Sequence, residues 1–143
     1  MKIDLNGNLV CVRANEDVTS KRNLNYFMGI SEKTAGTRHL SMNLVKIPPG
    51  GKAEPHYHDS FEAAIYILEG RVDNRYGEGL KKSIVTEKGD FLFIPPGVPH
   101  QPANLSDTEP ALALICRSIA SEEEPVIPYD PPGEAPEQKV SQL

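Results

Sequence analysis

The chain has 143 residues, which suits one compact domain, and it contains 13 prolines, 11 glycines and no tryptophan. This composition predicts many turns and short elements, so it disfavours long helices and favours a β-sandwich or barrel. The formal net charge is −5, but residues 1–121 carry 14 basic and 14 acidic side chains, and the excess of acids lies in residues 122–143. A neutral domain without a basic patch is not expected to bind nucleic acid or an anionic membrane.

Targeting signals and membrane spans are not expected. The first residues contain charged side chains and no long apolar run, which argues against a secretory signal peptide. The longest apolar runs, 63–68 and 111–116, have six residues each, far too few to span a bilayer. Cys11 and Cys116 each lie in an apolar stretch, which predicts buried free thiols and a cytoplasmic protein. A disulfide between them would require the two ends of the chain to lie side by side.

In chain order, residues 1–39 are expected to form one strand, at 9–12, and a loop that reaches the barrel. From residue 40 the pattern sharpens, and turn signals such as Pro48-Pro49-Gly50-Gly51 separate the apolar segments. The expected strands are 41–47, 63–68, 71–76, 83–86, 91–94, 101–104 and 110–118. Turns that recur every 8–12 residues without a helical period are typical of an all-β barrel or sandwich. The predicted barrel therefore comprises residues 40–121.

The C-terminal segment, residues 122–143, contains five prolines and six acidic side chains and has too little apolar content to fold alone. Two interpretations stay open. It is a solvated tail, or it is an arm that packs on a second subunit through Val126, Ile127 and Tyr129.

Three of the four histidines fall into two motifs with defined spacing. The first reads Gly50-x5-His56-Tyr57-His58-x3-Glu62-x7-Gly70, and the second reads Gly89-x5-Pro95-x-Gly97-x2-His100-x3-Asn104. Together they resemble the two signature motifs of the cupin superfamily, which are small double-stranded β-helix (jelly-roll) barrels. The resemblance covers roughly residues 40–118, and the second motif matches the family pattern at every fixed position. It implies an all-β, single-domain, RmlC-like cupin fold.

The residues of the motifs predict a metal site. His56 and His58 share one strand face, and Glu62 has the same parity, while His100 arrives from another strand. Such a set resembles the site of metal cupins, with three histidines and one glutamate, and implies one divalent ion: Fe, Mn, Ni, Zn or Cu. One departure matters, because seven residues separate Glu62 from Gly70 where the family usually has six. Either a bulge lies within 63–69, or Glu62 is displaced and three histidines alone hold the metal; the alternative spacing would place the ligand at Ala63.

Two further side chains are candidates for the pocket. Tyr66 shares the parity of His58 and Glu62, although the suspected bulge makes its direction ambiguous. Arg75 could clamp a substrate carboxylate through its planar guanidinium, or it could be a surface residue of an outer strand.

The resemblance leaves three functions open. The first is a redox metalloenzyme of the dioxygenase type that binds O₂ beside a small organic substrate. The second is a non-redox isomerase, lyase or cyclase in which the metal polarises a carbonyl. The third is a module that binds a small carboxylate or sugar without turnover. In each case we expect a homodimer, because a single small barrel exposes sheet edges and an apolar face, with residues 9–12 and 126–129 crossing between subunits.

Overall fold

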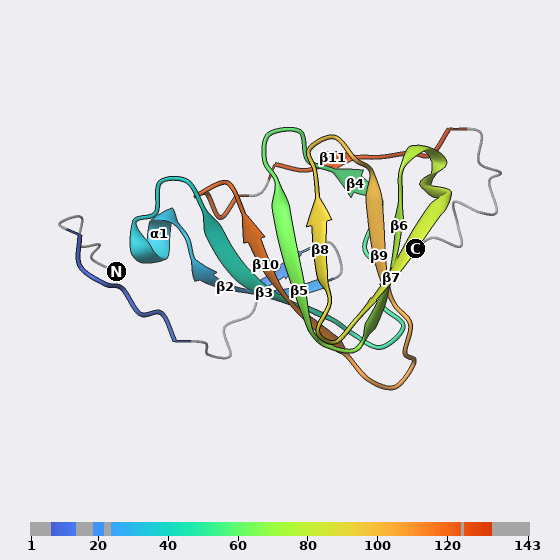
Figure 1. Cartoon of the computed structure of the whole chain (residues 1–143), viewed down its shortest axis with the longest axis horizontal. Coiled ribbons are helices and arrows are strands. Elements are labelled where there is room, and N and C mark those ends of the chain that lie inside the picture. Colours follow the sequence, from blue (N-terminus) through green and yellow to red (C-terminus); the bar gives the residue numbers. More distant parts are fainter. Residues whose placement is uncertain (1–6, 14–18, 22–23, 124, 133–143) are drawn as a thin grey trace.

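The structure is a computed structural model that describes residues 7–13, 19–21, 24–123 and 125–132. Strands dominate it, with one short α-helix and one 3₁₀ turn (Figure 1). The elements are β1 (Thr19–Lys21), β2 (Leu24–Ile30), α1 (Glu32–Ala35), β3 (Ser41–Ile47), β4 (His56–Tyr57), β5 (Ala63–Glu69), β6 (Arg71–Tyr76), the 3₁₀ turn η1 (Glu78–Leu80), β7 (Lys82–Glu87), β8 (Phe91–Ile94), β9 (His100–Asn104), β10 (Ala111–Arg117) and β11 (Ile127–Pro128).

The strands form two antiparallel sheets with interleaved chain order. One sheet has the order β1-β2-β3-β10-β5-β8, and the other has the order β11-β4-β9-β6-β7. Figure 1 shows the two sheets side by side, with the chain passing between them at the ends of the strands. This arrangement confirms the predicted all-β jelly-roll barrel. The strands predicted at 41–47, 71–76 and 91–94 have those bounds in the structure.

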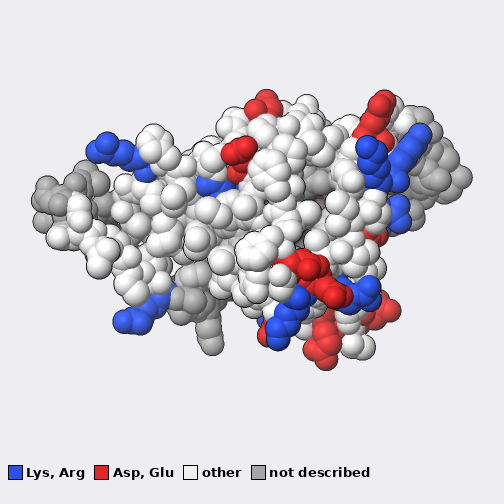
Figure 2. Space-filling view, viewed as in Figure 1, with Lys and Arg blue, Asp and Glu red and all other residues white. Residues whose placement is uncertain are grey.

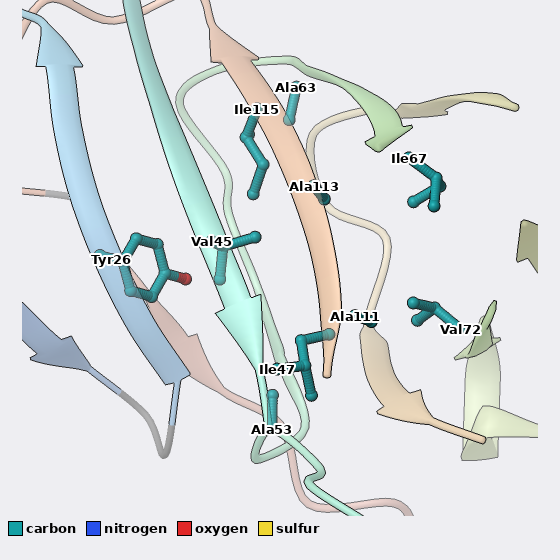
Figure 3. Packing of buried hydrophobic residues seen from close by; sticks show 10 residues of the cluster. All are labelled: Tyr26, Val45, Ile47, Ala53, Ala63, Ile67, Val72, Ala111, Ala113 and Ile115. Atoms are coloured by element: carbon teal, nitrogen blue, oxygen red, sulfur yellow. The ribbon is translucent and has the colours of Figure 1, made fainter. Parts of the chain in front are cut away.

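The core lies between the sheets and follows from strict alternation along two central strands. In β3 every second residue from Ser41 to Ile47 is buried, and in β10 every second residue from Ala111 to Arg117 is buried. Because residues two apart point to one face of a strand, these positions face the barrel interior. Figure 3 shows how the apolar members of this cluster point toward one another. Several of them are alanine, and so small a side chain leaves room inside the barrel.

The residues between the buried positions of these strands point to the outer face of the six-stranded sheet. This outer face also carries large apolar side chains. Met42 on β3 is 37% exposed, and Phe91 and Phe93 on β8 are 82% and 57% exposed. Figure 2 shows that the surface over β3, β10, β5 and β8 is mostly uncharged. An apolar patch of this kind is typical of a surface that another chain covers.

The N-terminal segment differs from its prediction. Residues 7–13 form no strand, and Leu9 is fully exposed. The apolar residues at 26–30 instead belong to β2, which pairs with β3. Cys11 is exposed, so the prediction that its thiol is buried is wrong, whereas Cys116 is half-buried; both cysteines are free. No helix in the described part of the chain has the length and apolar character needed to span a membrane.

The C-terminal segment folds back on its own barrel. Residues 125–132, which we call the C-terminal strap, contain β11, and β11 pairs antiparallel with β4. The backbone N–H of Tyr129 donates a hydrogen bond to the carbonyl of Pro55 (3.0 Å). The hydroxyl of Tyr129 accepts a hydrogen bond from the N–H of Gly79 (2.8 Å). The interpretation of a solvated tail is therefore wrong for residues 125–132. The segment expected to cross to a second subunit, 126–129, lies against its own chain.

Candidate metal centre

The three histidines of the motifs meet inside the barrel. His56 lies in β4, His58 directly follows it, and His100 begins β9, where it is the register partner of His56. The ring centroids are 4.4 Å apart for His56 and His100, 5.0 Å for His56 and His58, and 5.5 Å for His58 and His100. All three are buried, and each offers one nitrogen that lies within 4.8 Å of the others. The group could therefore hold a metal ion.

Local structure explains why the two motifs meet. The proline-rich turn before β9 contains Gly97, whose φ of +84° favours glycine. The N–H of Gly97 donates to the carbonyl of His58 at 2.6 Å. This bond ties the end of the first motif to the beginning of the second. A short turn of fixed shape thus brings His100 beside the other two histidines.

Backbone carbonyls place a proton on the same nitrogen, Nδ1, of all three rings. Nδ1 of His56 lies 2.7 Å from the carbonyl of Glu54, Nδ1 of His58 lies 2.9 Å from that of Pro125, and Nδ1 of His100 lies 2.9 Å from that of Val98. A carbonyl only accepts, so each Nδ1 carries the proton and donates. In a neutral ring the lone pair is then on Nε2, the nitrogen available as a metal ligand. When the rings are neutral, the site therefore offers three nitrogen ligands in fixed orientations.

Glu62 does not join this group. Its side chain is exposed, whereas the next residue, Ala63, is buried and pairs with Ile94 of β8. Consecutive residues of a strand point to opposite faces, so an inward Ala63 leaves Glu62 on the outer side. The register of β5 with β10 does shift opposite Leu112 and Ala113. That irregularity lies near the far end of β5, so it does not turn Glu62 inward.

Among the described residues, the group that could hold a metal ion comprises the three histidines and does not include Glu62. The structure places Ala63 at the inward position, as the alternative spacing of the first motif would have it. Alanine has no ligand atom to offer there.

The histidines line a cavity of about 70 Å³ in the barrel interior. Its wall is mostly apolar, and among the described residues that line it none is Asp or Glu. Besides the histidines, the wall includes three residues with polar side chains, namely Tyr26, Asn74 and Arg117. The cavity thus joins a possible metal site to a mostly apolar chamber with the basic side chain of Arg117 in its wall.

The two other pocket candidates lie elsewhere. Tyr66 is on the outer face of β5, where its ring centroid is 4.7 Å from that of Phe91. Arg75 is exposed and forms an ion pair with Asp73, with Nε and Oδ2 separated by 3.1 Å. Neither residue lines the cavity. For Arg75 the interpretation as a surface residue holds.

Sequence reasoning missed two features of the site. Arg117 ends β10, and its side chain is buried in the cavity wall. The signal was the alternation of Ala111, Ala113, Ile115 and Arg117, which puts a charged residue on an apolar face. The second feature is the carbonyl of Pro125, which no local motif could reveal because it lies 67 positions from its partner His58.

Comparisons with known proteins agree with this architecture. The family model described as the cupin domain matches residues 43–116, about half of the chain. A germin-like protein (subfamily 2 member 4) of Arabidopsis thaliana is 32% identical over 87 residues, which are 58% of this chain and 40% of the relative. An uncharacterized protein of Methanocaldococcus jannaschii is 36% identical over 76 residues, which are 50% of this chain and 54% of the relative. The chain thus spans about half of the length of the curated relatives that it matches.

Solved structures share the fold at low sequence identity. The structure of KdgF from Halomonas sp. superposes with a TM-score of 0.65 and 16% identity, covering 80% of this chain and 96% of that one. The family match spans both histidine motifs, and the structure has two antiparallel sheets around an interior histidine group. The chain therefore belongs to the cupin family.

Proposed function

We propose that this chain is a metal-dependent cupin enzyme of the dioxygenase type, acting on a small organic substrate. The observation that carries the proposal is the set of three buried histidines at the wall of an apolar cavity. Three protein ligands leave coordination positions open for exogenous molecules. A site of neutral imidazoles suits divalent Fe, Mn, Ni, Cu or Zn, and the first four can undergo redox chemistry.

When bound, a redox-active ion would supply the electrons and the positions at which O₂ and the substrate react side by side. The histidines and the apolar residues of the cavity would have different roles. His56, His58 and His100 would hold the ion through Nε2, because their Nδ1 atoms bond to carbonyls. Apolar side chains such as Ile65, Ile94 and Ile115 surround the cavity; they would exclude water and limit side reactions.

Metal content is the first test of this proposal. Plasma mass spectrometry on tag-free protein should find close to one transition metal per chain in wild type and a large loss in His100→Ala. The matched control is His39→Ala, because His39 is exposed and lies outside the cavity. Wild-type protein that binds no transition metal even after reconstitution would overturn the proposal.

Reaction type is the second test. Oxygen uptake by Fe-loaded protein, measured with an electrode against a panel of small catechols, enols and 2-oxo acids, should be substrate-dependent and absent in His100→Ala. Conversion without oxygen uptake, followed by NMR, would replace the dioxygenase with an isomerase or lyase. Binding without conversion would replace the enzyme with a binding module.

A further inference from the structure

The C-terminal strap, residues 125–132, lies directly against the first histidine motif. Its strand β11 pairs antiparallel with β4, and Pro128 is the register partner of His56 (Figure 1). The carbonyl of Pro125 accepts a hydrogen bond from Nδ1 of His58 at 2.9 Å. None of the strap residues lines the cavity, so the strap contacts the histidine motif from outside the cavity.

The strap also holds a strained turn. The hydroxyl of Tyr129 accepts a hydrogen bond from the N–H of Gly79 in η1 at 2.8 Å. The next residue, Leu80, is buried and has a φ of +54°, a left-handed conformation that is unfavourable for residues other than glycine. Such a conformation persists only where surrounding contacts hold it. The bond with Tyr129 is one of these contacts, so release of the strap would also loosen η1.

The strap is built to dock weakly. Its strand has two residues, and four of the eight strap residues are proline, which has no backbone N–H to donate. The prolines also restrict the undocked chain, which lowers the entropy cost of docking. A short segment with few donors opens at a low free-energy cost compared with the core strands. A ligand with a modest preference for the docked state can therefore shift this equilibrium.

Metal binding at the histidines would favour the docked strap. An ion bound to Nε2 of His58 requires the ring to carry its proton on Nδ1 and to keep one orientation. The docked strap holds the ring in this state through the carbonyl of Pro125. Loss of such a partner lowers metal affinity about 10- to 100-fold. Because the coupling of two equilibria is reciprocal, a bound ion stabilises the docked strap by the same factor.

We propose that the C-terminal strap is a metal-dependent latch, which docks on β4 when the three histidines hold an ion and opens more often in the metal-free chain. The inference rests on the metal site of the proposed function and not on the reaction type. It goes beyond that function because it assigns a regulatory role to a segment outside the cavity. An open strap would hold His58 less firmly, so the docked latch would slow release of the ion.

Hydrogen exchange of backbone amides tests the latch in the full chain. The amide of Tyr129 reports strap docking through its bond to the carbonyl of Pro55, and the amide of Gly79 reports the contact with η1. Exchange followed by NMR should slow about 10- to 100-fold at both amides when Zn²⁺ saturates the protein. The amide of Gly89 donates to the carbonyl of Ile67 at 2.9 Å in a turn outside the strap. It should slow much less.

Three variants show whether the effect requires the metal site and the strap. In His100→Ala, which removes a ligand supplied by β9, Zn²⁺ should leave exchange at Tyr129 unchanged. Tyr129→Phe removes the hydrogen bond to η1, so it should speed strap exchange and Zn²⁺ release to a chelator about two- to tenfold. Tyr66→Phe is the matched control, since Tyr66 lies on the outer face of β5 beside Phe91, and it should behave like wild type. Melting curves show whether each variant folds.

Zn²⁺ that binds wild type at about one ion per chain but leaves the strap amides unchanged would overturn the inference. Slowing of equal size at Gly89 would also overturn it, because the ion would then stabilise the whole barrel. The same holds for slowing of the strap amides in His100→Ala, which would place the effect outside the metal site.

Failure of the proposed function is distinguishable from failure of the latch. Wild type that takes up no metal would overturn both, and metal content identifies that case. A strap that responds to Zn²⁺ in a protein without oxygen-dependent turnover would support the latch and overturn only the dioxygenase.

Discussion

Removal of the C-terminal strap should weaken metal binding although the strap contributes no ligand. The carbonyl of Pro125 accepts the hydrogen bond from Nδ1 of His58 at 2.9 Å. A truncation that ends at Glu123 deletes this acceptor together with the pairing of β11 with β4. His58 would then rotate more freely and could protonate at either nitrogen, so its Nε2 would be a poorer ligand.

The expected magnitude follows from the geometry. One of three ligands loses the partner that orients it, and loss of such a partner costs about 10- to 100-fold in metal affinity, or about 1.4–2.7 kcal/mol. A competition titration of Zn²⁺ against a chromogenic chelator measures this change directly. Urea unfolding of the metal-free proteins shows whether the truncated barrel still folds.

Two controls separate the strap from the rest of the tail. A shorter truncation that removes only residues 133–143 retains every contact described for the strap and should bind Zn²⁺ like wild type. Tyr129→Phe removes only the hydrogen bond with the N–H of Gly79, so it should weaken binding less than the full truncation. Unchanged affinity in a folded chain that ends at Glu123 would refute the reasoning, because another acceptor would then serve His58 equally well.

Three further outcomes are expected. Glu62→Ala should bind Zn²⁺ within about twofold of wild type in the same titration. The reason is that the side chain of Glu62 is exposed, and substitutions on the surface have little effect. A loss of affinity comparable to that of His100→Ala would show that Glu62 is a ligand. Gly70→Ala should lower the free energy of unfolding by about 2–4 kcal/mol in urea, since φ is +89° and an added Cβ would lie 2.9 Å from Cα of Ala111. Gly89→Ala, with φ of +95° and no atom within 4 Å of an added Cβ, should cost less, and equal losses would contradict the role of the contact. We expect wild type to form a homodimer through the apolar outer face of the six-stranded sheet, and Phe91→Glu to weaken it; light scattering that finds wild type monomeric at micromolar concentration would argue against this interface.

Much of the fold could be predicted because its signals are local. Turn residues separate the segments 41–47, 71–76 and 91–94 from their neighbours. The structure has strands with those bounds. The histidines could be predicted for a similar reason. His56 and His58 share a face by their spacing, and a rigid turn leads into His100. Such features depend on neighbouring residues, whose geometry the backbone fixes.

The sequence by itself thus determined an all-β cupin barrel and three of the four candidate metal ligands. Only the tertiary structure decided that Ala63 and not Glu62 faces inward, that Arg117 enters the cavity, and that the C-terminal strap orients His58. Each of these depends on which face of a strand meets the second sheet, or on a pairing between distant segments. A one-residue change of parity reverses the direction of every side chain that follows, and a hydrogen bond across 67 positions leaves no trace in local sequence. The physical reason is that packing of the whole barrel, and not the neighbouring residues alone, determines strand register and long-range pairing.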